Sequence, residues 1–198
     1  MLLFGHMGIT LAAGIALNKW LTKGRYFNIE SQKKGDCSQA YSGAERRAFC
    51  PFVKKHLNYI FLLVGSLLPD IIDKPVGGIF FYSTFHNGRI FSHTLCFILF
   101  LAILGMFIYK RWKRPWGFIL CFGSAVHLVL DQMWLTPHTL LWPIYGWNFP
   151  KCDSVNFFHW LPGIFHALIT NPYVYTGEII GFGILIWFVK NFIRIERE

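Results

Sequence analysis

The sequence predicts an all-α integral membrane protein, a bundle of about five transmembrane helices with an aromatic outer loop. Of the 198 residues, 54% are hydrophobic and only 15% are charged, whereas a soluble domain usually carries about 25% charged residues. The apolar residues form blocks close to the length of a membrane span, and the mean hydropathy is +0.41. These features exclude a disordered chain, a collagen-like repeat and a disulfide-stapled secreted fold. At this length we expect a single multi-pass domain over residues 1–198.

Five apolar blocks account for the predicted spans. Their approximate bounds are 2–21, 57–72, 90–109, 115–135 and 172–193. A helix needs about 20 apolar residues to cross the hydrocarbon core, and the last three blocks reach that length. The first block contains Asn18 and Lys19 near its end, where the lysine can extend to the interface. The second is short, because its uninterrupted apolar run stops before Pro69.

Two long segments connect these blocks. Residues 22–56 are polar and basic, and we expect this loop on the cytoplasmic side against anionic headgroups. Residues 136–171 form the aromatic outer loop, in which Asp153 or Ser154 can N-cap a short helix that ends near Ile169. Such a helix would lie at the interface or cover a site beneath it.

The distribution of basic residues predicts the orientation in the membrane. Of the 19 Lys and Arg residues, 16 fall in segments on one side and only three, Lys74, Arg89 and Lys151, on the other. The positive-inside rule then places the N-terminus outside and the C-terminus in the cytoplasm of a cell (inner) membrane protein. The net charge of +9 is therefore mainly a topology signal. Because the basic residues show no recognition motif, we expect no nucleic-acid partner.

Ionisable side chains inside the predicted spans carry the functional prediction. Such groups are costly at membrane depth and usually face a cavity or the bundle interior. They are His6, Asp70, Asp73, His93, His127, Asp131 and Glu178. Most lie roughly 20–26 Å from their cytoplasmic anchors, in a hydrocarbon layer about 30 Å thick. Residues of four or five helices thus converge near the outer surface.

The spacing of these residues predicts a metal site. His127 and Asp131 are four positions apart on one helix face, and Asp70 and Asp73 share a face if the helix continues past Pro69. Carboxylates gathered at low dielectric repel one another unless a cation neutralises them. Histidine with carboxylate suits zinc, or a mixed zinc/manganese pair, as one ion or two. The predicted metal ligands are His6, Asp70, His93, His127 and Asp131.

The motifs around these residues resemble the membrane-bound metal-dependent hydrolases, also described as YdjM-like, LexA-binding, inner-membrane-associated hydrolases. The resemblance runs from His6 to about Pro143 and rests on His6 and on the segments GSLLPDIIDKP at 65–75, GRIFSHTL at 88–95, HLVLD at 127–131 and TLLWP at 139–143. It implies a multi-pass membrane protein with a metal-dependent hydrolase site. The chain departs from the family pattern at Lys74 and Gly88, where many members have histidine, so the number of metal ions stays open.

Together these observations predict a membrane-embedded, phosphoesterase-like hydrolase. Its substrate would be a phosphoester or related ester of a lipid or lipid-linked molecule at the outer leaflet. The bound metal would activate water, Asp73 or Glu178 would accept the proton, and Arg89 would bind a phosphate through its guanidinium group. Glu178 can instead serve only as a hydrogen-bond partner.

Other interpretations of the same residues stay open. His127 and Asp131 can be a hydrogen-bonding pair between helices, and Asp70 or Asp73 can form a structural salt bridge with Arg89. A non-catalytic scaffold or regulator would bind a cytoplasmic protein or DNA through the basic segment 19–55. A transporter is disfavoured, because the cytoplasmic halves of the predicted spans are almost wholly apolar.

Overall fold

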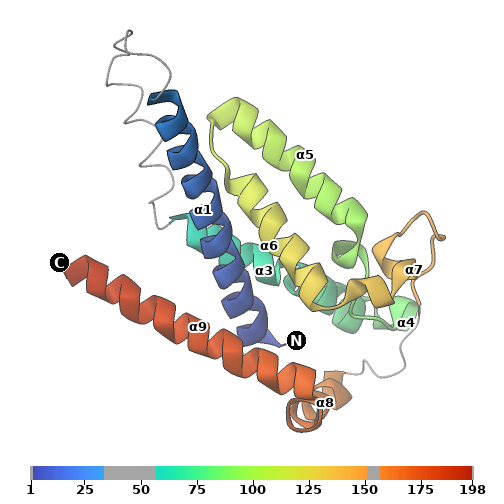
Figure 1. The fold of residues 1–198 in the computed structure, drawn as a ribbon. Coiled ribbons are helices and arrows are strands. Elements are labelled where there is room, and N and C mark those ends of the chain that lie inside the picture. The colour runs from blue at the N-terminus through green and yellow to red at the C-terminus, as the bar shows by residue number, and fades with distance from the viewer. Residues whose placement is uncertain (1, 34–56, 151–156, 198) are drawn as a thin grey trace.

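The computed structural model describes residues 2–33, 57–150 and 157–197. These residues form helices and short connections without β-strands, so the predicted all-α class is confirmed (Figure 1). The long helices are α1 (Leu3–Lys33), α3 (Leu57–Pro75), α5 (Leu95–Trp112), α6 (Trp116–Leu130) and α9 (Pro172–Arg197). The shorter elements are η1 (Val76–Phe80), α4 (Tyr82–Phe85), η2 (Phe91–His93), η3 (Met133–Leu135), α7 (Pro137–Leu140) and α8 (Phe157–Thr170).

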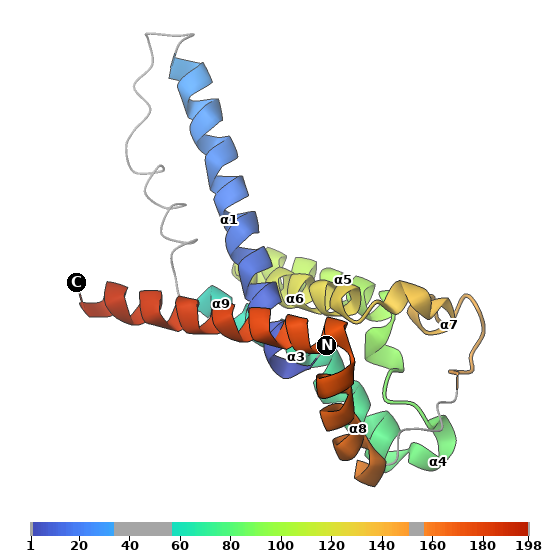
Figure 2. The same cartoon turned by 60° about the horizontal axis from the view of Figure 1, so that its bottom comes forward.

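Helix α6 packs against both α3 and α5, and α1 packs against α9 and α3 (Figures 1 and 2). Glycines at the crossings let the backbones approach closely, as in many membrane helix pairs. A Cβ atom on Gly181 of α9 would lie 2.1 Å from the backbone oxygen of Phe4 in α1. A Cβ on Gly123 of α6 would lie 2.7 Å from the backbone oxygen of Leu62 in α3. These two crossings therefore position the helices that carry the site.

We expect Gly181→Ala to separate α1 from α9 and to lower the midpoint of thermal unfolding in detergent. The added methyl group meets backbone, which cannot rotate away, and overpacking of this kind costs about 1–3 kcal/mol. The matched control is Gly183→Ala on the same helix, where a Cβ atom would meet nothing within 4 Å. Equal unfolding midpoints for the two variants would contradict this close crossing.

Polar side chains make up much of the buried interior of this fold, beside apolar ones such as Leu11, Ile90 and Met133. The largest fully buried side chains include His6, His93, His127 and Asp73. The apolar side chains of α5 face outward, since only 11% of the segment Leu95–Trp112 is buried inside the molecule. An apolar exterior around a polar interior is expected where the surrounding medium is lipid.

The expected bundle of five spans is not confirmed. Within the described residues, two helices are long and apolar enough to cross a membrane, Leu95–Trp112 and Pro172–Asn191. Helix α6 is apolar but has only 15 residues. Helix α3 ends in a charged turn that contains Asp70, Asp73 and Lys74, which lowers the mean hydropathy of its sequence.

Helix boundaries also differ from the predicted blocks. Helix α1 continues to Lys33, into the segment expected as a loop, and residues 34–56 lie outside the described part. Helix α3 does continue through Pro69. Helix α5 begins at Leu95 because the Thr94 side chain caps it by accepting from the Phe97 N–H at 3.1 Å.

The outer end of α6 and the outer helix show similar shifts. Helix α6 ends at Leu130 instead of 135, and Gln132 just beyond it has a left-handed φ of 53°. The predicted outer helix corresponds to α8, which ends at Thr170. Its expected caps, Asp153 and Ser154, lie outside the described residues.

Candidate metal centre

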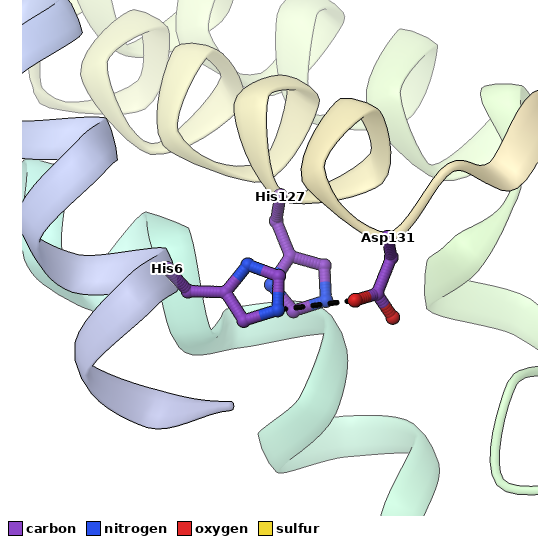
Figure 3. Close-up of side chains that lie close together, drawn as sticks. All are labelled: His6, His127 and Asp131. Atoms are coloured by element: carbon purple, nitrogen blue, oxygen red, sulfur yellow. Dashed lines mark ion pairs between the residues drawn. The ribbon is translucent and has the colours of Figure 1, made fainter. Parts of the chain in front are cut away.

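The structure brings all five predicted ligands together at one end of the bundle. Their donor atoms form two groups, each with all atoms within 4.8 Å of one another. The first group is His6, His127 and Asp131, and the second is Asp70, His93 and His127. Figure 3 shows the first group, with His6 reaching from α1 toward the side chains at the end of α6. His127 belongs to both groups and lies at their centre.

Two neighbouring carbonyl groups of α3 hold α6 close to the site, and one of them contacts His127. Pro69 has no N–H, so the carbonyl group of Gly65, four residues earlier, lacks its usual helical donor. The Ser124 hydroxyl of α6 donates to that oxygen at 2.9 Å. Beside it, the Ser66 carbonyl lies 2.6 Å from Nδ1 of His127. Because a carbonyl only accepts, Nδ1 carries the proton, and the lone pair of Nε2 faces the site.

Asp73 holds His93 in the same manner. One carboxylate oxygen, Oδ2, lies 2.7 Å from Nδ1 of His93 and accepts from the backbone N–H groups of Ile90 and His93. The other, Oδ1, accepts from the Ser92 N–H at 3.0 Å and from the Ser92 hydroxyl. The carboxylate therefore makes Nδ1 of His93 a donor and leaves the Nε2 lone pair facing the site.

These bonds argue against Asp73 as the general base that the sequence suggested. The side chain is fully buried, and both oxygens already accept hydrogen bonds from described residues. A base needs an oxygen within reach of the proton that it removes. The structure places Asp73 behind His93, where it orients a ligand.

His6 lies flat against His127, with ring centroids 4.1 Å apart and an interplanar angle of 20°. Its Nε2 atom is 3.1 Å from Oδ1 of Asp131. Even so, within the described residues neither ring nitrogen of His6 makes a hydrogen bond of acceptable geometry, although the side chain is buried. A buried imidazole with no hydrogen bond usually has a role that needs its lone pair.

Glu178 lies at the N-terminus of α1. Its Oε1 accepts from the backbone N–H groups of Leu2 and Gly5 at 2.8 and 2.9 Å, and Oε2 accepts from Phe4 at 3.0 Å. A carboxylate at this end satisfies the first N–H groups of the helix and complements its dipole. Both oxygens are thus used to hold the turn that carries His6, which argues against the expected general-base role.

We expect Glu178→Ala to lower the unfolding midpoint and to weaken metal binding moderately. Loss of a helix cap costs about 0.5–2 kcal/mol, and the released turn carries His6. Metal affinity is best measured by competition with a chromogenic chelator. Thr176→Ala is the control, because its exposed hydroxyl bonds only to Pro172 one turn earlier in the same helix. Unchanged affinity and stability in Glu178→Ala would show that the cap does not position His6.

Two basic side chains border the site. Nη2 of Arg89 lies 2.7 Å from Oδ2 of Asp131, and Nζ of Lys74 lies 2.5 Å from Oδ2 of Asp70. The Lys74 and Arg89 side chains are 44% and 47% exposed, so the site reaches the surface here. Arg89 therefore pairs with Asp131, and the alternative salt bridge with Asp70 or Asp73 is wrong.

Sequence reasoning left several of these residues out of the site. Lys74 stands four residues after Asp70, so the two side chains lie on the same face of a helix. This spacing could have predicted their ion pair. Ser66, Ser92 and Ser124 carry no comparable signal, because their partners lie 19 to 61 positions away in the chain.

The donor atoms fit a divalent metal ion. Nε2 of His93 and Nε2 of His127 lie 3.4 Å apart. Two nitrogens bound tetrahedrally at about 2.0–2.1 Å to zinc would be about 3.3–3.4 Å apart. Oδ1 of Asp70 lies 3.6 Å from the first nitrogen and 3.8 Å from the second. Two lone pairs facing each other beside a carboxylate are stabilised by a proton or a metal ion between them, and imidazole with carboxylate suits zinc or manganese.

The model of one protein family covers nearly all of the chain. The YdjM inner membrane protein family matches residues 1–194. The chain belongs to this family. No curated protein and no solved structure matches it. The YdjM family name places the protein in the inner membrane, in agreement with the apolar exterior of α5 and α9. The name states no reaction, so the activity has to be argued from the site.

Proposed function

We propose that this YdjM-family protein is a membrane-embedded, metal-dependent hydrolase. Its substrate class is a phosphoester or related ester of a lipid or lipid-linked molecule. One observation carries the proposal: His93 and His127 each direct an Nε2 lone pair to a common point beside Asp70. Nδ1 of His93 donates to Asp73, and Nδ1 of His127 donates to the Ser66 carbonyl. A purely structural network would need an extra proton on one imidazole to make this contact a hydrogen bond, whereas a divalent ion between the two nitrogens satisfies both lone pairs.

The chemistry of such a site follows from its donors. A bound divalent ion would supply an activated water molecule and would polarise a phosphoryl or acyl oxygen. One of the two donor groups would hold the ion through His127, Asp73 and the Ser66 carbonyl orient His93 and His127, and Arg89 offers its exposed guanidinium group to an anionic substrate. Since Asp73 and Glu178 are engaged elsewhere, proton transfer is left to whichever of Asp70 and Asp131 does not hold the ion.

The position of the site supports a lipid substrate at the outer leaflet. The site lies where α1 and α5 begin and where α6 ends, opposite the basic turn 110–114 that joins α5 to α6. We propose a multi-pass protein with the N-terminus outside and the C-terminus in the cytoplasm, in agreement with that charge. Exposed apolar side chains near the end of α6, Trp134 and Leu135, offer a surface for an acyl or prenyl chain.

Elemental analysis of detergent-purified protein tests the metal, and a hydrolysis screen with phospholipids and prenyl phosphates tests the reaction. We expect the purified protein to contain zinc or manganese. We also expect it to release a phosphorylated headgroup or phosphate from the lipid, and this release should stop when the metal is removed by a chelator. Metal without hydrolysis of any lipid phosphoester would favour a non-catalytic scaffold. Protein that binds neither metal after incubation with both would overturn the proposal.

A further inference from the structure

The two ligand carboxylates share an arrangement that bears on how many ions the site holds. In each, one oxygen faces the histidines and the other pairs with a basic side chain. Asp70 directs Oδ1 to Nε2 of His93 and His127, and Oδ2 to Lys74. Asp131 directs Oδ1 to His6 at 3.1 Å, and its Oδ2 lies 2.7 Å from Nη2 of Arg89 and 4.0 Å from Nε2 of His93. Each carboxylate therefore lies between an imidazole cluster and a fixed positive charge.

This arrangement leaves too few ligands for two ions. A neutral imidazole nitrogen binds a single metal, and Nδ1 of His127 is already bonded to Ser66, so His127 can serve only one of its two groups. A carboxylate bridge between two ions that uses both oxygens is disfavoured here, because the second oxygens of Asp70 and Asp131 pair with Lys74 and Arg89. A second ion would be left with one histidine and one aspartate, whereas catalytic zinc sites have three protein ligands.

We propose that the site holds one divalent ion and that Lys74 and Arg89, in place of a second ion, bind the phosphoryl oxygens of the substrate. This inference rests on the proposed hydrolase function and narrows its substrate to a phosphoester. Both side chains are about half exposed while the carboxylates that they pair with are largely buried. The ammonium and guanidinium groups can therefore turn to an incoming anion without leaving the rim of the site.

Charge balance agrees with a phosphoester. Asp70, Asp73 and Asp131 carry three negative charges, and Lys74 and Arg89 carry two positive ones. With neutral histidines, one divalent ion brings the site to a single net positive charge, which attracts an anion. A carboxylic ester is uncharged and offers these groups one neutral carbonyl oxygen, whereas an anionic phosphoryl group accepts from both the guanidinium fork and the ammonium.

The first experiment counts ions. Protein purified in detergent is incubated with excess zinc, desalted, and analysed for zinc per chain by mass spectrometry. We expect about one ion per chain. Two ions that survive desalting would overturn the inference. A chain that retains neither zinc nor, after a parallel incubation, manganese would instead defeat the proposed hydrolase function itself, so the two failures are distinguishable.

The second experiment measures binding of inorganic phosphate to the zinc-loaded protein by calorimetry. We expect Lys74→Gln and Arg89→Gln each to weaken phosphate binding about tenfold or more, the range of a charge-assisted hydrogen bond. Zinc affinity should not fall in Lys74→Gln, because a positive charge beside the ion is removed, and Lys74→Arg should retain phosphate binding. Lys110→Gln, exposed at the opposite end of α5, is the control for overall charge.

A parallel titration with short-chain phosphatidate distinguishes a lipid headgroup from free phosphate. We expect the lipid to bind more tightly than inorganic phosphate and to show the same dependence on Lys74 and Arg89. Phosphate and phosphatidate affinities that are unchanged in both glutamine variants, with one zinc still bound and the unfolding midpoint preserved, would overturn the inference and leave the hydrolase proposal standing.

Discussion

Replacing His127 with alanine is expected to lower zinc affinity by more than about 100-fold, beyond the 10–100-fold typical of residues that only support a ligand. His127 is the one residue common to both donor groups, and its Nε2 lies 3.4 Å from that of His93. Its loss therefore breaks both groups at once. The measurement is zinc per chain after desalting, which requires no knowledge of the substrate.

The control for this variant is His166→Ala, an exposed histidine on α8 that belongs to neither donor group. It should retain zinc at the wild-type level. Full zinc content in His127→Ala would show that the metal, if bound, lies elsewhere. Hydrolysis measured on the same preparations is expected to follow the zinc content.

Replacing Asp73 is expected to destabilise the protein even without metal. Alanine at this position leaves the N–H groups of Ile90, Ser92 and His93 buried without their acceptor. Removing one partner of such a buried, charged network costs about 3–5 kcal/mol. Asparagine keeps the size but offers one acceptor oxygen, so its cost should be smaller, about 1–3 kcal/mol. Thermal unfolding of the metal-free protein in detergent measures both.

Asp70→Asn is the matched comparison, because Asp70 stands three residues earlier on the same helix and faces the donor atoms directly. We expect this variant to lose zinc affinity while the metal-free protein keeps its unfolding midpoint. Asp73→Asn should instead lower the unfolding midpoint of the metal-free protein more than Asp70→Asn does, and should lower zinc affinity less. Equal effects of the two substitutions would contradict the assignment of Asp70 as a ligand and Asp73 as the residue that orients His93.

Much of the candidate site could be predicted because the membrane restricts where ionisable residues occur. In an apolar sequence, His6, His93, His127 and the nearby aspartates stand out, and helical rise alone places them at similar depth. The structure brings the same five ligands together. The continuation of α3 past Pro69 stayed open in the sequence as a condition for Asp70 and Asp73 to share a face, and the structure shows that the helix does continue.

The roles of the acidic residues could not be predicted in this way. Asp73 and Glu178 look like available bases in the sequence, yet both accept hydrogen bonds from backbone N–H groups far away in the chain. Backbone donors have no signature in side-chain identity. Which carboxylate is free therefore depends on which loop or helix end is packed against it.

The sequence by itself determined the all-α class, the apolar exterior and which His and Asp side chains are candidates for metal binding, because composition and helical spacing act locally. Only the tertiary structure decided which nitrogen of each histidine faces the site, where Arg89 is paired, and that Glu178 caps α1. The physical reason is that hydrogen bonds are short and directional, so their partners are set by packing between helices and not by position along the chain.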